Sequence, residues 1–440
     1  MIEFYIDKFS YKSNEKIYFY INNSSTNSSI NITILDLKKN IISQSSCSAG
    51  KQNTPQLSFA EGCDWQADYI LSLSQIDFDI KLPNIYFVKI ENSENEKFFT
   101  TFIIKRNIYT KAVVCNTNTW CAYNGYGGAS FYFPNSSNPK HRNLLLSKNK
   151  YTEKNKNNKT GTISCNFKRP FPSISSQIND LLNTGIESER THLLDGETFL
   201  WKFLSDNNYD YDVIIDSDVE DIANLKNRKI IFLNCHPEYW SHKMFFNLNE
   251  TIKNKTNLIY LGGNGIWRKV ILKNDRIEKI GYPYCSKPGI LNASSNVLSR
   301  DKFAKNNKLT IEPYQILGMF YDNRGHSFPY CYFECLSNHK IFNRVGIKKG
   351  EHFGIQNSGC APSGHESDKI KHKYINKLTK DNIVRPLLAK GLNKNGDGGE
   401  ITIFDIYNSK VFSCGSIPFT RCLVEPKVKN MLINVINDFN

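Results

Sequence analysis

The stretch RKIIFLNCHPEYWSHKMFFNLNETIKNKTNLIYLGGNG (228–265) decides the fold class of this 440-residue chain. It opens and closes with apolar runs as long as buried strands, and between them SHKMFFNLNETIKNK (241–255) has the spacing of a helix that begins at Ser241. Strand, helix and strand in this order, with nearly continuous apolar strands, are typical of a parallel sheet covered on both faces. In such sheets functional residues gather in the loops beyond the carboxyl ends of the strands.

The same pattern extends along most of the chain. KAVVCNT (111–117) and YDVIID (211–216) predict further strands, and ETFLWKFLSDNN (197–208) predicts a helix with four large apolar residues on one face. Near the C-terminus, EITIFDIYNSKVFSCGS (400–416) predicts a hairpin and EPKVKNMLINVINDFN (425–440) a closing helix. The region between 265 and 350 predicts additional strands or a flap. We therefore predict one α/β domain over residues 106–440.

Residues 1–105 have a different pattern. Five short β-branched and aromatic runs follow one another with partial alternation, separated by polar stretches: IEFYIDKF, KIYFYINN, INITILDL, NIYFVKI and KFFTTFIIK. This spacing predicts an all-β sandwich as a separate N-terminal domain.

Composition excludes several classes of protein. A hydrophobic fraction of 40% is too high for a disordered chain, and no apolar run approaches the ~18 residues that a membrane span needs. The net charge of +14 is concentrated in mixed Lys/Asn stretches and lacks arginine clusters, so we expect no nucleic-acid or membrane partner. Without a secretion signal we expect a cytoplasmic protein whose 12 scattered cysteines are reduced.

Four polar or glycine-rich segments follow predicted strands or occupy loops: TNTWCAYNGYGG (117–128), NCHPEYW (234–240), LGGNGIW (261–267) and SGCAPSGHESDK (358–369). Each alone also fits a packed turn or a helix start, but together they predict one site at neighbouring strand ends. In the second segment, Cys235 could be a thiolate nucleophile that His236 activates. Alternatively, the His-x-Glu pair could provide a metal ligand and a partner side chain. Bulky neighbours of Cys235 argue against the sharp turn that a nucleophile would need.

With these segments, KRPF (168–171), TFLWKFL, YDYDVIIDSDVED and the tail EITIFDIYNSKVFSCGSIPFT, the chain resembles the large (beta) subunit family of N,N-dimethylformamidase. The N-terminal opening is similar to the β-sandwich that precedes the catalytic domain in that family. The resemblance implies a three-layer α/β sandwich, similar to class I glutamine amidotransferases, over residues 106–440.

The resemblance also implies a site and a reaction. A mononuclear Fe(III) would be held by two tyrosines and one glutamate, with Tyr123 matching the first tyrosine and Glu238 the carboxylate. His236, Asn264 and Glu366 match polar residues that line the site, with Glu366 as the base and His236 or Asn264 facing the oxyanion. The implied reaction is hydrolysis of a small non-peptide amide, with a small partner subunit or a homo-oligomer as the implied assembly.

The sequence departs from the family at the second tyrosine. Phe171 stands near the expected position, and Tyr151 upstream has the wrong spacing. Another tyrosine could replace it, the metal could differ, or the metal could be lost. Two alternatives to the iron amidase therefore stay open: a cysteine-dependent hydrolase or transferase using Cys235, and a non-catalytic relative that binds a small molecule.

Overall fold

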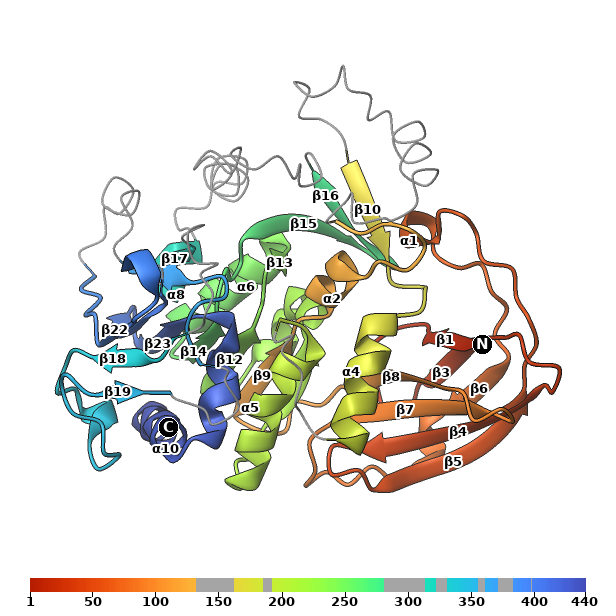
Figure 1. Ribbon diagram of the computed structural model, residues 1–440, viewed down its shortest axis with the longest axis horizontal. Helices are drawn as coiled ribbons and strands as arrows, with labels where there is room; N and C mark the ends of the chain where they lie inside the picture. Colours follow the sequence, from red (N-terminus) through yellow and green to blue (C-terminus); the bar gives the residue numbers. More distant parts are fainter. Residues whose placement is uncertain are drawn as a thin grey trace, which may run out of the picture. The chain divides into compact units, whose positions relative to one another are not determined.

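The computed structural model describes residues 1–131, 162–184, 192–280, 313–321, 331–354, 361–370, 383–396 and 398–440 (Figure 1). The chain forms two compact units. The first contains residues 1–106, 117–187 and 269–290, and the second contains residues 107–116, 188–268 and 291–440. Among the described residues no helix combines the length and the apolar character needed to cross a membrane. The fold is mixed α/β.

Two sheets at the N-terminus pack around one apolar core. The first sheet has the order β1 (Ile2–Ile6), β3 (Lys16–Asn23), β6 (Tyr69–Ser72), and the second has the order β2 (Ser10–Tyr11), β8 (Lys97–Ile104), β7 (Ile85–Asn92), β4 (Ser29–Asp36), β5 (Ile41–Ser48). Alternate residues of β3 are buried, as the alternation in the sequence predicts. Phe4 and Phe19 from one sheet join Ile32 and Phe102 from the other in a single cluster. All five predicted N-terminal runs therefore form strands.

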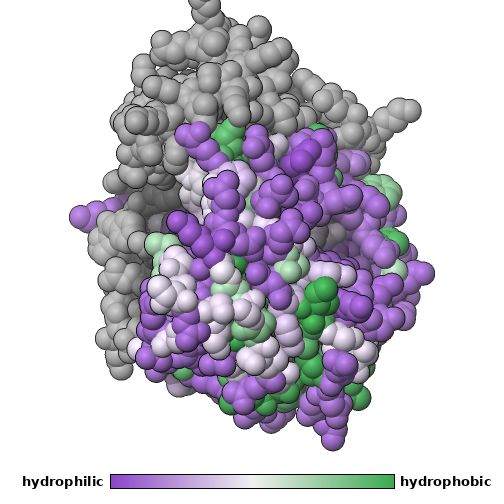
Figure 2. Space-filling view, turned by 90° about the vertical axis from the view of Figure 1, so that its right-hand side faces the viewer, coloured by the Kyte–Doolittle hydropathy of each residue, from purple (hydrophilic) through white to green (hydrophobic). Residues whose placement is uncertain are grey.

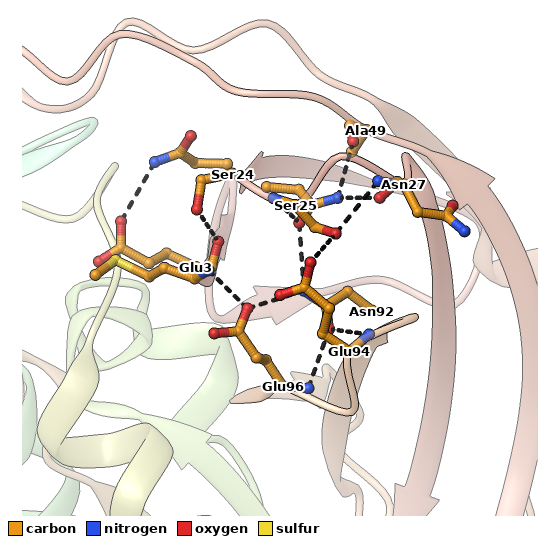
Figure 3. Close-up of polar contacts among 11 residues, drawn as sticks. Glu3, Ser24, Ser25, Asn27, Ala49, Asn92, Glu94 and Glu96 are labelled. Carbon is orange, nitrogen blue, oxygen red and sulfur yellow. Dashed lines mark hydrogen bonds and ion pairs between the residues drawn. The ribbon is translucent and has the colours of Figure 1, made fainter.

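Polar contacts join these two sheets at one end (Figure 3). The N-terminal ammonium of Met1 lies 2.7 Å from Glu96 Oε2, and Ser24 Oγ donates to the carbonyl oxygen of Met1 over 3.0 Å. Ser25 Oγ donates to Glu94 Oε1 over 2.5 Å. Because Glu94 and Glu96 lie in the turn between β7 and β8, these bonds tie the start of the chain to the second sheet. The coloured part of the face in Figure 2 is mostly hydrophilic, and its hydrophobic residues lie mainly toward the lower edge.

The rest of the first unit is a small sheet with three helices. Strand β16 (Arg276–Ile280) pairs antiparallel with both β10 (Thr162–Asn166) and β15 (Arg268–Lys273), which confirms that strands follow residue 265. The helices are α1 (Ser58–Glu61), α2 (Thr117–Tyr123) and α4 (Pro172–Asn183). Helix α4 is bound to β8 by a 2.9 Å hydrogen bond from the Phe99 amide to Ser175 Oγ. A 3-10 turn spans Leu73–Gln75.

The second unit is built on a nine-stranded sheet. Its order is β11 (Asp212–Ile215), β9 (Lys111–Cys115), β12 (Ile230–Cys235), β14 (Asn257–Gly262), β23 (Ser409–Gly415), β22 (Glu400–Ile406), β21 (Ala389–Gly391), β18 (Phe333–Cys335), β19 (His352–Phe353). The first five strands are parallel and the last four continue antiparallel. Every residue of β12 is buried, as its continuous apolar sequence predicts. The predicted hairpin is β22–β23, and it extends the parallel sheet.

Helices and short elements complete the second unit. They are α5 (Leu194–Asp206), α6 (His242–Lys253), α8 (Pro313–Leu317), α10 (Pro426–Phe439), β13 (Tyr239–Trp240), the two-stranded sheet of β17 (Phe320–Tyr321) and β20 (Asp368–Lys369), and 3-10 turns at Asp216–Glu220, Ile222–Leu225, Lys340–Phe342, Lys394–Gly396 and Ile417–Val424. Helix α6 begins where predicted, because Ser241 Oγ accepts a 3.1 Å hydrogen bond from the Met244 amide. Helix α5 begins three residues before the predicted start, and α10 forms as predicted.

Candidate functional site

Parallel strand pairing brings two of the predicted loop segments and the end of the predicted hairpin to one edge of the sheet. In register, Cys235 at the end of β12 pairs with Gly262 at the end of β14, and Gly262 pairs with Gly415 at the end of β23. The residues that follow β12 and β14 therefore leave the sheet side by side. His236 and Glu238 follow β12, and this edge also carries the turn after β14.

His236 lies between two carboxylates. Its Nε2 is 3.1 Å from Glu238 Oε2 and 3.2 Å from Glu366 Oε2, and all three side chains are buried or nearly so. Its Nδ1 lies 3.1 Å from the carbonyl oxygen of Gly263. Burial lowers the pKa of the imidazole, but the charge of Glu366 and the hydrogen bond and charge of Glu238 outweigh burial and raise this pKa to about 9. The two glutamates therefore favour the protonated, imidazolium form of His236.

Glu238 faces a positive group on each side. Its Oε1 lies 3.4 Å from Nε of Arg268 while its Oε2 faces His236. The backbone supports this arrangement, because the amides of Trp267 and Arg268 donate to the carbonyl oxygen of Glu238 over 3.0 and 2.8 Å. The buried carboxylate is thus charge-compensated, as a carboxylate with 1% exposure must be.

Asn264 connects the turn after β14 to Glu366. Its Nδ2 donates to Glu366 Oε2 over 2.9 Å, so the same carboxylate oxygen faces both Asn264 and His236. Asn264 and Glu366 have φ angles of +53° and +45°, in the left-handed region that few non-glycine residues adopt. The structure therefore brings together four of the predicted site residues: His236, Glu238, Asn264 and Glu366.

Glycines at the strand ends make room for the segment that carries Glu366. A Cβ added to Gly263 would lie 1.9 Å from the carbonyl oxygen of Glu366, and one added to Gly415 would lie 2.3 Å from that of Asp368. Only residues without a side chain allow this close approach of two backbones. The GG and CGS sequences thus determine how closely the GHESD segment approaches the sheet.

Sequence reasoning missed several aromatic and polar residues near this cluster. Tyr321 pairs in register with Asp368, and its ring centre lies 5.2 Å from that of Trp267. Burial, followed by the charges of Glu366 and Glu238, raises the pKa of the Tyr321 phenol well above its ordinary value of 10. The phenol is therefore protonated at neutral pH. No local pattern predicted Tyr321, because a two-residue strand has no detectable period.

Two further histidines adjoin the cluster. The ring centre of His192 lies 6.4 Å from that of His236 and 5.7 Å from that of His365. His365 stands beside Glu366 in the quoted GHESD segment, but His192 precedes helix α5 and no motif indicated it.

The predicted nucleophile Cys235 is in an unfavourable setting. It has a φ of +58°, so the sharp turn that its bulky neighbours were expected to prevent does occur. However, its Sγ is buried and lies 3.8 Å from the carbonyl oxygen of Leu193. Burial first, then the charges of Glu197 and Asp195, raises the pKa of the thiol well above 9. A thiol held protonated in this way is a poor nucleophile.

Tyr123 is the last residue of α2 and is half-buried. It belongs to the first unit and Glu238 to the second, so their meeting around one ion stays a prediction. Phe171 is a core residue with 4% exposure, its ring centre 5.3 Å from that of Phe9. It therefore cannot replace the second tyrosine, and Tyr151 lies outside the described residues.

Arg169 explains why KRPF accompanies the Tyr123 segment. Its guanidinium is fully buried and donates to the carbonyl oxygens of Cys121, Asn124, Tyr126 and Asn166, over 2.5–3.1 Å. The carbonyl of Cys121 lies in the last turn of α2, where a helix leaves acceptors unpaired, and those of Asn124 and Tyr126 lie in the turn that follows. Arg169 therefore fixes the backbone on both sides of Tyr123.

The described residues contain no group of three or more His, Cys, Asp or Glu side chains arranged to hold a metal. A phenol can also supply a hard oxygen ligand. The charges of Glu366 and Glu238 both act on the phenol of Tyr321. Carboxylate and phenolate oxygens suit a hard cation better than zinc, which favours nitrogen and sulfur. These oxygens are of the chemical type that a hard metal ion binds.

Comparison with known proteins shows a match to one protein family. A family model described as "N,N-dimethylformamidase beta subunit-like, C-terminal" matches residues 36–430. No curated protein matches the sequence. One similar solved structure is a Bifidobacterium dentium beta-glucuronidase complexed with coumarin-3-O-glucuronide, with 8% identity, a TM-score of 0.19, and coverage of 59% of this chain and 43% of that one. A likeness this weak carries no argument.

Proposed function

The chain belongs to the N,N-dimethylformamidase beta subunit-like family, and on this premise we propose that it is a metal-dependent hydrolase of small non-peptide amides. The observation that carries the proposal is the buried His236, whose Nε2 lies 3.1 Å from Glu238 and 3.2 Å from Glu366 at the carboxyl edge of the sheet. These are three of the residues that the family resemblance assigned to the site. The proposal includes a three-layer α/β arrangement similar to glutamine amidotransferases, and a small partner subunit or a homo-oligomer.

Glu366 is the residue that we assign to proton transfer. Its Oε2 accepts from Asn264 and faces His236, which fixes the carboxylate plane. With 12% exposure it is the more accessible of the two glutamates. Glu366 takes the proton of the attacking water and passes it to the nitrogen of the leaving amine, so that an amide and water give an amine and a carboxylic acid.

Asn264 and His236 supply hydrogen-bond donors. The Nδ2 group of Asn264 carries two hydrogens, of which one binds Glu366. We assign the second to the oxygen that becomes negative as the amide carbonyl is attacked. His236 is cationic and faces both carboxylates, so its main role is to hold Glu366 in place and to offset the negative charge.

Glu238 is the residue we assign to the metal, together with Tyr123 and with Tyr321 in place of the missing second tyrosine. A hard trivalent ion such as Fe(III) would supply Lewis-acid polarisation of the amide carbonyl. A carboxylate has more than one lone pair on each oxygen, so the present contacts of Glu238 to His236 and Arg268 leave it able to ligate.

The test combines metal analysis with turnover of N,N-dimethylformamide, measured as dimethylamine release. We expect purified protein to contain iron, Glu238→Gln to lose it, and Glu366→Gln to retain iron while turnover falls about 10²–10⁴-fold, the usual contribution of general acid–base catalysis. Glu250→Gln on helix α6 is the matched control, because the Glu250 carboxylate contacts Lys253 and Asn249 of the same helix. Wild-type turnover in Glu366→Gln would remove the assignment of the base.

Other outcomes would favour the alternatives. Loss of turnover both on thiol alkylation and in Cys235→Ala, in protein whose activity does not depend on iron, would favour the cysteine enzyme. An iron-free, inactive protein that binds a small molecule tightly would favour the non-catalytic relative.

A further inference from the structure

A buried pair behind the candidate site takes no part in the proposed reaction. The hydroxyl of Tyr260 donates to Asp368 Oδ2 over 2.7 Å, and both side chains are at most 1% exposed. Tyr260 lies inside strand β14, and Asp368 begins β20. A buried carboxylate paired with a phenol rather than a cation is costly to keep, so it needs an explanation.

Both members of the pair bind the turn that carries Asn264. Asp368 Oδ1 accepts from the Asn264 amide over 2.9 Å, and the Tyr260 hydroxyl accepts from the Gly265 amide over 2.8 Å. This turn contains left-handed φ angles at Asn264 and, two residues later, at Ile266, of +53° and +48°. Two amides held by buried acceptors keep an otherwise uncommon backbone in one conformation.

Asp368 also lies in the same segment as Glu366. Its carboxylate therefore ties the segment that carries Glu366 to the turn that carries Asn264. A second bond joins the same two segments, because Asn264 Nδ2 donates to Glu366 Oε2.

We propose that Tyr260 and Asp368 are positioning residues, which hold the Asn264 turn so that its side chain keeps Glu366 against His236. The inference rests on the proposed function for its catalytic consequence. The placement of Glu366 beside His236 does not depend on a substrate, so it can be tested without turnover.

The first test is a double-mutant cycle on turnover of N,N-dimethylformamide. Tyr260→Phe removes one hydroxyl, and we expect kcat to fall about 10–100-fold with little change in KM, the usual cost of losing an outer hydrogen bond. In the Asn264→Ala background the same change should have no further effect, because Tyr260 acts through Asn264. Independent, multiplicative losses would overturn the inference.

Tyr211→Phe is the matched control. Tyr211 is also buried, and its hydroxyl donates to the carbonyl oxygen of Trp201 over 2.9 Å, away from the site. It should lose a similar amount of thermal stability and keep wild-type kcat. If Tyr260→Phe and Tyr211→Phe behave alike in kcat, then Tyr260 only stabilises the fold.

The second test needs no turnover and thus separates this inference from the proposed function. Crystal structures of the variants report the distance from Glu366 Oε2 to His236 Nε2, which is 3.2 Å in the unaltered chain. We expect this distance to lengthen beyond hydrogen-bonding range in Tyr260→Phe and Asp368→Asn but not in Tyr211→Phe, because each site change weakens the bonds that hold the Asn264 turn. An unchanged distance in both site variants would overturn the positioning role, even in a protein that hydrolyses no amide.

Discussion

Gly263→Ala is the sharpest test of how the site is assembled. The new methyl carbon would lie 1.9 Å from the carbonyl oxygen of Glu366, and real Cβ atoms essentially never approach another heavy atom closer than 3.0 Å. The Glu366 segment or the turn after β14 must therefore move by roughly 1.1 Å, and the Ile417 amide at 3.1 Å leaves little room on the other side. A displacement of about 1 Å at a reacting group costs about 100-fold in rate, and overpacking costs about 1–3 kcal/mol of stability.

Both quantities can be measured on the same preparation. Turnover of N,N-dimethylformamide gives kcat, and urea denaturation gives the free energy of unfolding. Gly50→Ala is the control, since an added Cβ there meets nothing within 4 Å and should leave kcat unchanged. Suppose that Gly263→Ala kept kcat within about threefold of wild type. The close approach of the Glu366 backbone to Gly263 would then not matter for the reaction, and the reasoning from backbone proximity would be refuted.

Two further predictions concern charge. His236 has a pKa of about 9 in the fold against an ordinary 6.5, so its stabilising contribution is complete below about pH 6.5 and is lost as the pH rises through 9, by up to about 3 kcal/mol. Denaturation curves between those pH values should show this loss, and His236→Gln should abolish it. Removing the Arg169 guanidinium leaves buried carbonyls unsatisfied, so Arg169→Met should lower the unfolding free energy by about 3 kcal/mol or more. The exposed neighbour Lys168 should tolerate the same change within about 0.5 kcal/mol, and equal effects at the two positions would contradict the assigned role of Arg169.

Local patterns predicted the sheet and its helices well. The strands near 230 and 258 are continuous apolar runs, and Ser241 caps helix α6 as its position in the sequence indicates. His236, Glu238 and Asn264 could be grouped because residues after neighbouring parallel strands share an edge. Their contacts with Glu366 then follow from a loop that the sequence could only mark as polar.

The supporting residues could not be predicted in the same way. Tyr260 sits inside a buried strand, where an aromatic residue normally indicates core packing, and its hydroxyl has a partner 108 positions away. Arg268 opens an ordinary strand, and its contact with Glu238 depends on how the backbone of residues 266–268 binds that of 237–238. Tyr321 pairs with Asp368 through a two-stranded sheet too short to have a period. Each case depends on long-range pairing, which local periodicity does not encode.

The buried guanidinium of Arg169 has a consequence for how the end of helix α2 responds to substitution. Its acceptors at positions 121, 124 and 126 are all main-chain oxygens, which every amino acid supplies. A substitution at one of these positions therefore keeps an acceptor for Arg169, and its effect comes from the side chain that is lost. At Asn124 that side chain donates to the carbonyl oxygen of Pro170 and accepts from the amide of Tyr126, so main-chain and side-chain bonds hold this backbone independently.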